Sequence, residues 1–117
     1  MKILVIGQGG REHALAWKLS QSKKSNIVFV APGNGGTSTE EKCVNVSINV
    51  NDFSGIKKFI IEEKIDLVVI GPEDPLVNGL VDYLKDLNIL VFGPCSNGAR
   101  LEGSKIFSKK FLFENNI

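Results

Sequence analysis

Four short runs of branched apolar residues divide the chain, and apolar and polar positions do not alternate within them. They cover residues 2–6, 27–30, 66–70 and 89–92, and each is followed within two residues by Gly or Pro. Runs of this kind suit strands that are buried on both faces, as in a parallel sheet between layers of helices. A weaker segment at 44–50 alternates apolar and polar residues as an edge strand does, so we expect five strands.

Amphipathic stretches between these runs predict helices. The expected helices cover residues 11–21, 53–64 and 74–87. For the second helix, Asn51 or Asp52 can serve as the N-cap. For the third, Asp74 can cap the helix, Pro75 occupies the first turn, where proline is tolerated, and leucines recur at helical spacing.

The alternation of strand and helix predicts the fold class. Right-handed crossovers between parallel strands should build an open α/β sheet of about five strands with helices on both faces. A chain of 117 residues, of which 43% are hydrophobic, is long enough for one such domain with its own core. In sheets of this type ligands bind beyond the carboxyl ends of the strands, so the turns that follow the strands are the candidate binding loops.

Composition excludes several classes of partner. Fourteen basic and 13 acidic residues leave a formal net charge of +1, which gives no overall field to attract nucleic acid or a membrane surface. No apolar run is long enough to span a bilayer and the N-terminus lacks a signal pattern, so we expect a cytoplasmic protein. Cys43 and Cys95 have no metal-binding spacing and are expected to be reduced thiols.

The first apolar run leads into a glycine-rich turn and helix start, GQGGREHALAWKL at residues 7–19. A strand, a glycine turn and a helix start bring backbone N–H groups and the positive end of the helix dipole to one point, which favours a phosphate or carboxylate. Arg11 supports this interpretation, because a cation in the first turn weakens an empty helix and an incoming anion would reverse that penalty. The alternative is a tight strand-to-helix connection that holds nothing.

The turn matches neither of two nucleotide-binding motifs and offers no metal site. The dinucleotide fingerprint requires a third glycine where Glu12 stands, and an acidic residue at the end of the second strand, where Ala31 and Pro32 follow instead. The triphosphate-binding pattern G-x-x-x-x-G-K-[ST] does not occur. His13 has no second histidine or paired cysteine beside it, so we interpret it as a structural hydrogen-bonding residue.

Two further turns follow strands at the same expected rim. Residues 31–37, APGNGGT, contain glycines that let the backbone approach a ligand closely. Residues 71–76, GPEDPL, place Glu73 at the mouth of the sheet. Glu73 either accepts hydrogen bonds from sugar hydroxyls or an amine, or it is a solvated loop carboxylate.

Five motifs taken together resemble one family. They are GQGGREHALAWKL, APGNGGT, GPEDPLVNGLVD, FGP and LEGSK, in that order along nearly all of the 117 residues. Their order and spacing resemble the amino-terminal domain of the phosphoribosylamine–glycine ligases, also called glycinamide ribonucleotide synthetases. The resemblance implies a preATP-grasp, Rossmann-like domain at residues 1–103 that binds substrate.

The resemblance also gives a meaning to the last part of the chain. Residues 104–117, whose pattern predicts a helix, would begin the linker helix to an ATP-grasp part that this sequence lacks. The aromatic residues of that helix indicate that the chain continues or docks on a partner.

The activity that the resemblance implies is a ligation in de novo purine biosynthesis. Family members join glycine to 5-phosphoribosylamine, using ATP with Mg²⁺ or Mn²⁺ bound mainly outside this domain. The reaction passes through a glycyl phosphate that the amine attacks, and it yields glycinamide ribonucleotide, ADP and phosphate. This chain alone is therefore expected to be inactive, and none of its residues is expected to be catalytic.

Residue by residue, the resemblance places the substrate site on three turns. The substrate-binding residues that it implies are Gly9, Gly10, Arg11, Glu12, Pro32, Gly33, Asn34 and Glu73. We expect the N–H groups of Gly9 and Gly10 to hold the 5′-phosphate, with added charge from Arg11. Glu73 and Asn34 would orient the ribose or the attacking amine.

Some alternatives stay open. Lys105 resembles the lysine that reaches ATP phosphates in the superfamily, or it is a solvated surface lysine. Gln8 stands where a smaller residue is frequent, so the loop contacts are not fixed by the resemblance. For the chain as a whole, the other functions are a free-standing nucleotide or dinucleotide-binding module and an interaction domain that binds no small anion.

Overall fold

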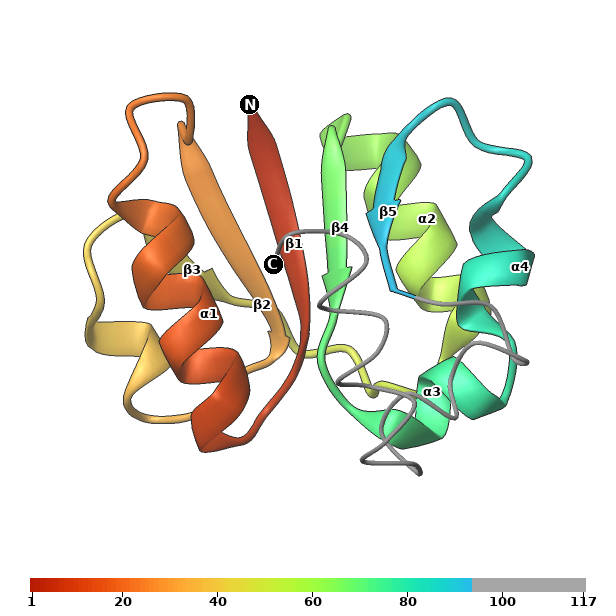
Figure 1. Cartoon of the computed structure of the whole chain (residues 1–117), viewed down its shortest axis with the longest axis horizontal. Coiled ribbons are helices and arrows are strands. Elements are labelled where there is room, and N and C mark those ends of the chain that lie inside the picture. Colours follow the sequence, from red (N-terminus) through yellow and green to blue (C-terminus); the bar gives the residue numbers. More distant parts are fainter. Residues whose placement is uncertain (94–117) are drawn as a thin grey trace, which may run out of the picture.

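The five expected strands form one parallel sheet in the order β3-β2-β1-β4-β5 (Figure 1). The strands are β1 (Lys2–Gly7), β2 (Ile27–Pro32), β3 (Cys43–Asn45), β4 (Leu67–Ile70) and β5 (Leu90–Phe92). The computed structural model describes residues 1–93. The predicted α/β class is confirmed, whereas the predicted helix at 104–117, Cys95 and Lys105 lie outside the described residues.

Helices cover the sheet on both faces (Figure 1). They are α1 (Gly10–Ser20), α2 (Phe53–Glu63), α3 (Glu73–Val77) and α4 (Leu80–Leu84), together with a short 3₁₀ helix, η1 (Thr37–Thr39). Apolar residues of α1 pack on one face, and those of α2, α3 and α4 pack on the other. The apolar runs lack alternation because the central strands are covered on both sides.

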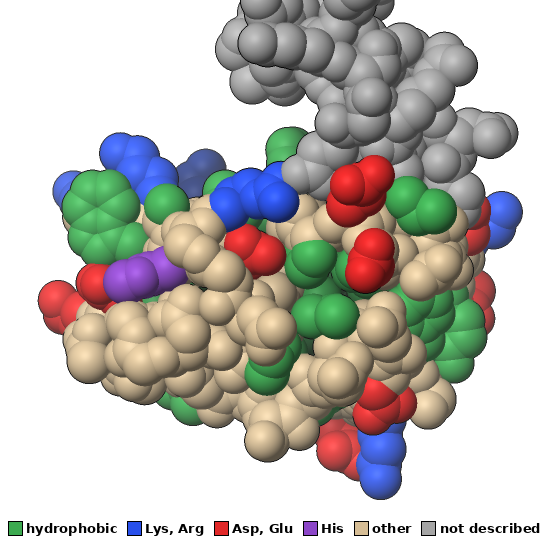
Figure 2. All heavy atoms as spheres, turned by 90° about the horizontal axis from the view of Figure 1, so that it is seen from below, with side chains coloured by type: hydrophobic (Ala, Val, Ile, Leu, Met, Phe, Trp, Pro, Cys, Tyr) green, Lys and Arg blue, Asp and Glu red, His purple; other side chains and the backbone are tan. Residues whose placement is uncertain are grey.

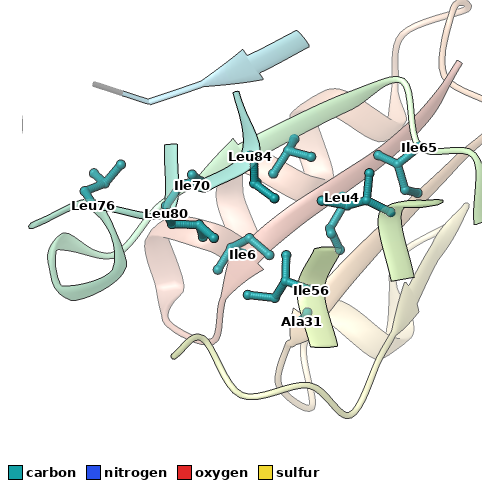
Figure 3. Packing of buried hydrophobic residues seen from close by; sticks show 11 residues of the cluster. Leu4, Ile6, Ala31, Ile56, Ile65, Ile70, Leu76, Leu80 and Leu84 are labelled. Carbon is teal, nitrogen blue, oxygen red and sulfur yellow. The ribbon is translucent and has the colours of Figure 1, made fainter. Parts of the chain in front are cut away.

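The larger hydrophobic core lies between the sheet and helices α2, α3 and α4 (Figure 3). Leu4 and Ile6 of β1 belong to it, together with Ile56 of α2 and Leu80 of α4, and all four are fully buried. Burying an apolar side chain of this size stabilises a fold by about 1.5–3 kcal/mol relative to leaving it exposed. These contacts therefore fix the helices to the sheet.

Helix α2 begins where the sequence predicted, and the structure decides between the two candidate caps. The Asp52 side chain accepts a hydrogen bond of 3.0 Å from the N–H of Gly55, so Asp52 is the N-cap and Asn51 is not. The helix ends at Glu63, and the C-cap Lys64 has a left-handed backbone with φ 56°. The cap satisfies one of the backbone donors that every helix start leaves without a partner.

The single helix expected at 74–87 is wrong, because the segment forms two short helices. Helices α3 and α4 are separated at Asn78 and Gly79, and Gly79 has φ 89°, a left-handed conformation that glycine adopts without a steric penalty. Asp74 is also not the cap: Pro72 occupies the N-cap position of α3, without a side-chain hydrogen bond. The leucines keep their helical spacing because both short helices present them to the same core.

The edge strand expected at 44–50 is shorter than predicted. Strand β3 ends at Asn45, and beyond it Val46 still donates a hydrogen bond from its N–H to the carbonyl of Val30. The apolar residues Val46, Ile48 and Val50 pack against the larger core. Burial of alternate side chains in an irregular segment therefore produced the alternation that was interpreted as a strand.

Helix α1 covers only part of one face of the sheet, and this face is exposed at the β5 edge. Val5 of β1 is fully buried on this face, whereas Leu90 and Phe92 are 63% and 65% exposed. Phe92 pairs with Val69, which belongs to the smaller core, so the two side chains share that face. Among residues 1–93, only α1 contributes helical side chains to this core.

The structure bears on two expectations from composition, one about the cysteine thiols and one about membrane-spanning segments. Cys43 is a buried free thiol in the smaller core. Burial raises the pKa of the Cys43 thiol, and the Glu40 carboxylate adds to that effect. Within residues 1–93, no helix is both long enough and apolar enough to cross a membrane.

The topology places a crevice between β1 and β4. The chain moves from β1 through α1 to β2 on one side, and from β4 through α3 and α4 to β5 on the other. The connections that leave β1 and β4 thus diverge to opposite faces of the sheet. In open α/β sheets this switch point is where ligands bind, at the carboxyl ends of the strands.

The N-cap of α2 gives a direct test of the fold. Asp52→Ala should lower the free energy of unfolding by about 1 kcal/mol, because the N–H of Gly55 loses its acceptor. Urea denaturation followed by circular dichroism measures this loss. Asn51→Ala, one residue away and without the capping bond, should change stability by less than about 0.5 kcal/mol. Equal losses in the two variants would contradict the assignment.

Candidate functional site

Three turns meet at the carboxyl ends of β1, β2 and β4. The N–H of Gly33 donates to the carbonyl of Gly7 at 3.0 Å, and the N–H of Gly71 donates to the carbonyl of Ile6 at 3.1 Å. These bonds join the start of each turn to the central strand. Figure 2 looks onto this rim, where acidic and basic side chains lie close together and the histidine lies to one side. The structure therefore brings together the turns that the sequence predicted to share an edge.

The start of α1 is open at this rim. Gly9 is its N-cap residue and no side chain caps the helix, so the first N–H groups have no side-chain acceptor. Gly9, Gly10 and Arg11 are all exposed. Apart from its chain neighbours and the backbone of α1, no atom of the described residues would lie within 4 Å of a Cβ added at Gly10. The exposed donors and the positive end of the helix dipole can therefore accept an anion from solvent.

The Glu12 side chain points toward the sheet, away from the exposed start of α1, and fills the crevice between β1 and β4. The residue is only 5% exposed. A Cβ atom on Gly7 would lie 2.2 Å from the Glu12 Cγ, and one on Gly71 would lie 2.6 Å from it. Gly7 also has φ 139°, which favours glycine. Positions 7 and 71 therefore require glycine, because the Glu12 side chain occupies the space that a Cβ atom would need. Glu12 stands where the dinucleotide fingerprint has its third glycine.

The Glu12 carboxylate has no hydrogen bond or ion pair to another described residue. Every side-chain nitrogen or oxygen that is completely buried in the described residues has a hydrogen-bond partner. The Glu12 oxygens therefore retain a small contact with solvent, at the rim. Sequence reasoning placed Glu12 in the site but did not predict this burial.

Asn34 connects the second turn to the glycine turn. Its Nδ2 donates to the carbonyl of Gln8 at 2.8 Å, and its Oδ1 accepts from the N–H groups of Gly36 and Thr37 at 2.8 and 2.9 Å. The predicted role of Asn34 in orienting the ribose or amine stays a prediction. In this structure its side chain holds the glycine turn in place from 26 residues away.

A second layer of polar residues supports Asn34, and sequence reasoning missed it. Thr37 Oγ1 donates to Asn45 Oδ1 at 2.6 Å, and Asn45 Nδ2 donates to the carbonyl of Asn34 at 2.8 Å. A Cβ atom on Gly33 would lie 2.2 Å from Asn45 Oδ1, so the turn packs directly on this layer. The sequence carried no signal for this layer, because the strand was expected at 44–50, whereas in the structure Asn45 ends β3 at this edge of the sheet.

The remaining predicted residues line the rim on either side. Pro32 ends β2 after a cis Ala31–Pro32 peptide bond and is partly buried. Glu73 is exposed as the first residue of α3, and it makes no hydrogen bond or ion pair to another described residue. The carboxylate of Glu73 is therefore available to a ligand at the rim.

His13 has a structural partner, as the sequence predicted. Its Nε2 lies 2.8 Å from Glu40 Oε1, which joins α1 to the segment after η1. A shallow hollow of about 320 Å³ lies beside this pair. A larger one of about 490 Å³ lies next to Met1 and Leu90, at the opposite end of the sheet. We favour the rim as the site because its donors and carboxylates converge there.

The arrangement has two chemically different parts. Exposed N–H groups of Gly9 and Gly10, with Arg11, suit an anion. The carboxylates of Glu12 and Glu73 accept hydrogen bonds only, and so they suit hydroxyl or amine groups. Among residues 1–93, no group of three or more His, Cys, Asp and Glu side chains could hold a metal ion. The arrangement is therefore chemically suited to a ligand with an anionic end and a donor-rich end.

The position of Glu12 can be tested by a double-mutant cycle. Gly71→Ala should destabilise the fold by about 1–3 kcal/mol, because its Cβ would overlap the Glu12 side chain. In a Glu12→Ala background the same change should cost less than about 0.5 kcal/mol. Urea denaturation of the four proteins measures the coupling. Gly35→Ala is the control, since beyond its chain neighbours no atom of residues 1–93 lies within 4 Å of the added Cβ. Additive losses in the cycle would contradict the packing.

Comparisons with known proteins agree with this site. The family described as phosphoribosylglycinamide synthetase, N domain, matches residues 1–102. The phosphoribosylamine–glycine ligase of Escherichia coli strain K12 is 53% identical over 117 residues, which are all of this chain and 27% of that protein. The corresponding protein of Nostoc sp. strain PCC 7120 is 50% identical and is covered to 28%.

A solved structure extends the likeness to three dimensions. The crystal structure of phosphoribosylamine–glycine ligase from Thermotoga maritima matches with a TM-score of 0.59 at 29% identity, over 100% of this chain and 25% of that one. The chain thus spans about a quarter of the length of the relatives that it matches. The motifs, the fold and these matches together show that the chain belongs to the phosphoribosylglycinamide synthetase N-domain family.

Proposed function

We propose that this chain is the substrate-binding amino-terminal part of a phosphoribosylamine–glycine ligase. The observation that supports this most directly is the rim itself. An uncapped helix start with exposed glycine N–H groups lies beside two carboxylates without partners among the described residues. A phosphorylated sugar with an amine combines the anionic end and the hydrogen-bond donors that such a rim can bind.

The proposed reaction joins glycine to 5-phosphoribosylamine with ATP in de novo purine biosynthesis. Attack of the amine on a glycyl phosphate gives glycinamide ribonucleotide, ADP and phosphate. ATP and its Mg²⁺ or Mn²⁺ would bind mainly in an ATP-grasp part outside this chain. The chain alone would be inactive and cytoplasmic, with small molecules rather than nucleic acid or membrane as partners.

Each turn has a distinct part in the proposed binding. The N–H groups of Gly9 and Gly10 hold the 5′-phosphate, and Arg11 adds positive charge. Glu73 faces the ribose or amine from the opposite side of the rim. Pro32, Gly33 and Asn34 form the second wall, and Asn34 also fixes the glycine turn through its bond to Gln8.

The proposal also covers the chain beyond the described residues. We place the substrate-binding domain at residues 1–103 and the start of a linker helix at 104–117, with Lys105 reaching ATP phosphates in the complete enzyme. The family match supports this boundary because it ends at residue 102. The exposed side chains of Leu90 and Phe92 support it as well, since they leave an apolar surface for further chain to cover.

The structure weighs against a dinucleotide-binding module. Such modules bring the pyrophosphate close to the glycine turn at the switch point. Here the Glu12 carboxylate occupies the crevice between Gly7 and Gly71, and it would repel a second negative group in that space. The ligase function is therefore the better supported of the two.

Arg11 provides the test of the anion site. The chain should bind ribose 5-phosphate, and Arg11→Ala should weaken binding roughly 10- to 100-fold, because a hydrogen bond to a charged group contributes about 1.5–3 kcal/mol. Isothermal titration calorimetry measures both affinities. Lys18→Ala removes an exposed cation from the other end of α1 and should leave binding unchanged.

Two outcomes of this titration would reject the proposal. One is a loss in Arg11→Ala of less than about twofold, which is too small for a charged hydrogen bond. The other is tight binding of NAD together with indifference to ribose 5-phosphate, which would favour the nucleotide-binding alternative.

A further inference from the structure

Glu12 differs from every other buried polar residue among those described. The others are Ser20, Ser25 and Thr37, and each of them makes side-chain hydrogen bonds within the protein. Glu12 is the one with a formal charge, and it makes no such bond to a described residue. Its oxygens keep only a small contact with solvent, so a ligand that covers Glu12 has to supply hydrogen-bond donors in place of that water, because an enclosed carboxylate without a donor is costly.

The glycine turn lies beside the Glu12 carboxylate and offers a direction from which that donor can arrive. A Cβ atom on Gly9 would lie 3.5 Å from Glu12 Oε2, and apart from its chain neighbours no other atom of residues 1–93 would lie within 4 Å of it. The missing side chain of Gly9 thus leaves a space beside the turn that is bordered by the carboxylate oxygen. A ligand group that rests against Gly9 would contact Glu12.

Charge decides which group of the ligand can take this position. A carboxylate accepts hydrogen bonds and donates none, and it repels a phosphate. The phosphate must therefore lie farther out, at the exposed N–H groups of the turn and Arg11. The part of the ligand that reaches Glu12 is then a neutral group with several donors.

We propose that Glu12 accepts hydrogen bonds from the adjacent 2- and 3-hydroxyls of the ribose, and that it selects ribose over deoxyribose phosphates. This inference rests on the proposed function and names the part of the substrate that Glu12 recognises. The two carboxylate oxygens can accept from two neighbouring hydroxyls at once. A site built around such a bond discriminates strongly against a ligand that lacks the hydroxyl, because the buried acceptor is then left without a partner.

Burial explains why the hydroxyls rather than the amine occupy this position. The amine has to react with an acyl group that is formed outside this chain, and so it must stay at the open side of the rim. Glu12 is only 5% exposed, whereas Glu73 at the edge is exposed. The deeper carboxylate therefore binds the unreactive hydroxyls, and the outer one lies nearer the amine.

A matched pair of sugar phosphates tests the inference. Ribose 5-phosphate and 2-deoxyribose 5-phosphate differ by one hydroxyl, and isothermal titration calorimetry gives the affinity of the chain for each. We expect the chain to bind the ribose compound at least tenfold more tightly. Glu12→Met replaces the carboxylate by a side chain of similar length that accepts no such hydrogen bonds. This variant should bind the two compounds equally, with the affinity that the unaltered chain has for 2-deoxyribose 5-phosphate.

Two further variants keep the test decisive if Glu12→Met does not fold. Gly9→Ala places a methyl group at ordinary contact distance from Glu12 Oε2, on an extended backbone that any residue adopts, so it should fold and lose the tenfold preference. Glu73→Gln alters the other carboxylate of the rim and should keep the preference. Circular dichroism of each variant checks folding.

The outcomes separate this inference from the proposed function. If the unaltered chain binds neither sugar phosphate, the proposed function fails and the inference fails with it. If it binds both equally, or if the preference survives in Glu12→Met or Gly9→Ala, the inference is overturned while the proposed function stands. Loss of the preference in Glu73→Gln instead would assign the hydroxyls to Glu73 and would also overturn it.

Discussion

The packing of Glu12 between Gly7 and Gly71 is the contact on which the candidate site depends. It closes the crevice that a doubly wound sheet leaves between its two central strands, and it does so with a carboxylate. In the first turn of α1, Arg11 is consequently an exposed residue, whereas Glu12 is buried against the sheet. In the proposed site, the phosphate of the ligand therefore lies at the exposed side of this turn, and the hydrogen-bond donors of the ligand lie at the side that faces the sheet.

Much of the fold could be predicted because its signals are local. The strands follow from apolar runs that lack alternation, and the start of α2 follows from Asp52, whose capping bond spans only three residues. The errors have a common cause. Both come from patterns that report which side chains are buried and not the backbone that carries them. The leucines of 74–87 recur at helical spacing although the helix breaks at Gly79. The apolar residues at 44–50 alternate because they face the core, although no continuous strand carries them.

The site was predictable at the level of turns but not of side chains. Parallel strands end at one edge, so the turns after β1, β2 and β4 had to share a rim. The bond from Asn34 to Gln8 spans 26 residues, and the burial of Glu12 depends on Gly71, which is distant in sequence. Such contacts depend on the tertiary arrangement, and neither a motif nor a resemblance to a family specifies them. In the structure, Asn34 holds the glycine turn through its bond to Gln8, and Glu12 is more deeply buried than Glu73.

The most direct test of this account is a crystal structure of the chain with ribose 5-phosphate. We expect the phosphate at the N–H groups of Gly9 and Gly10, with the sugar hydroxyls against the Glu12 carboxylate. A sugar phosphate bound instead in the hollow beside Met1 and Leu90, with the rim empty, would contradict the account.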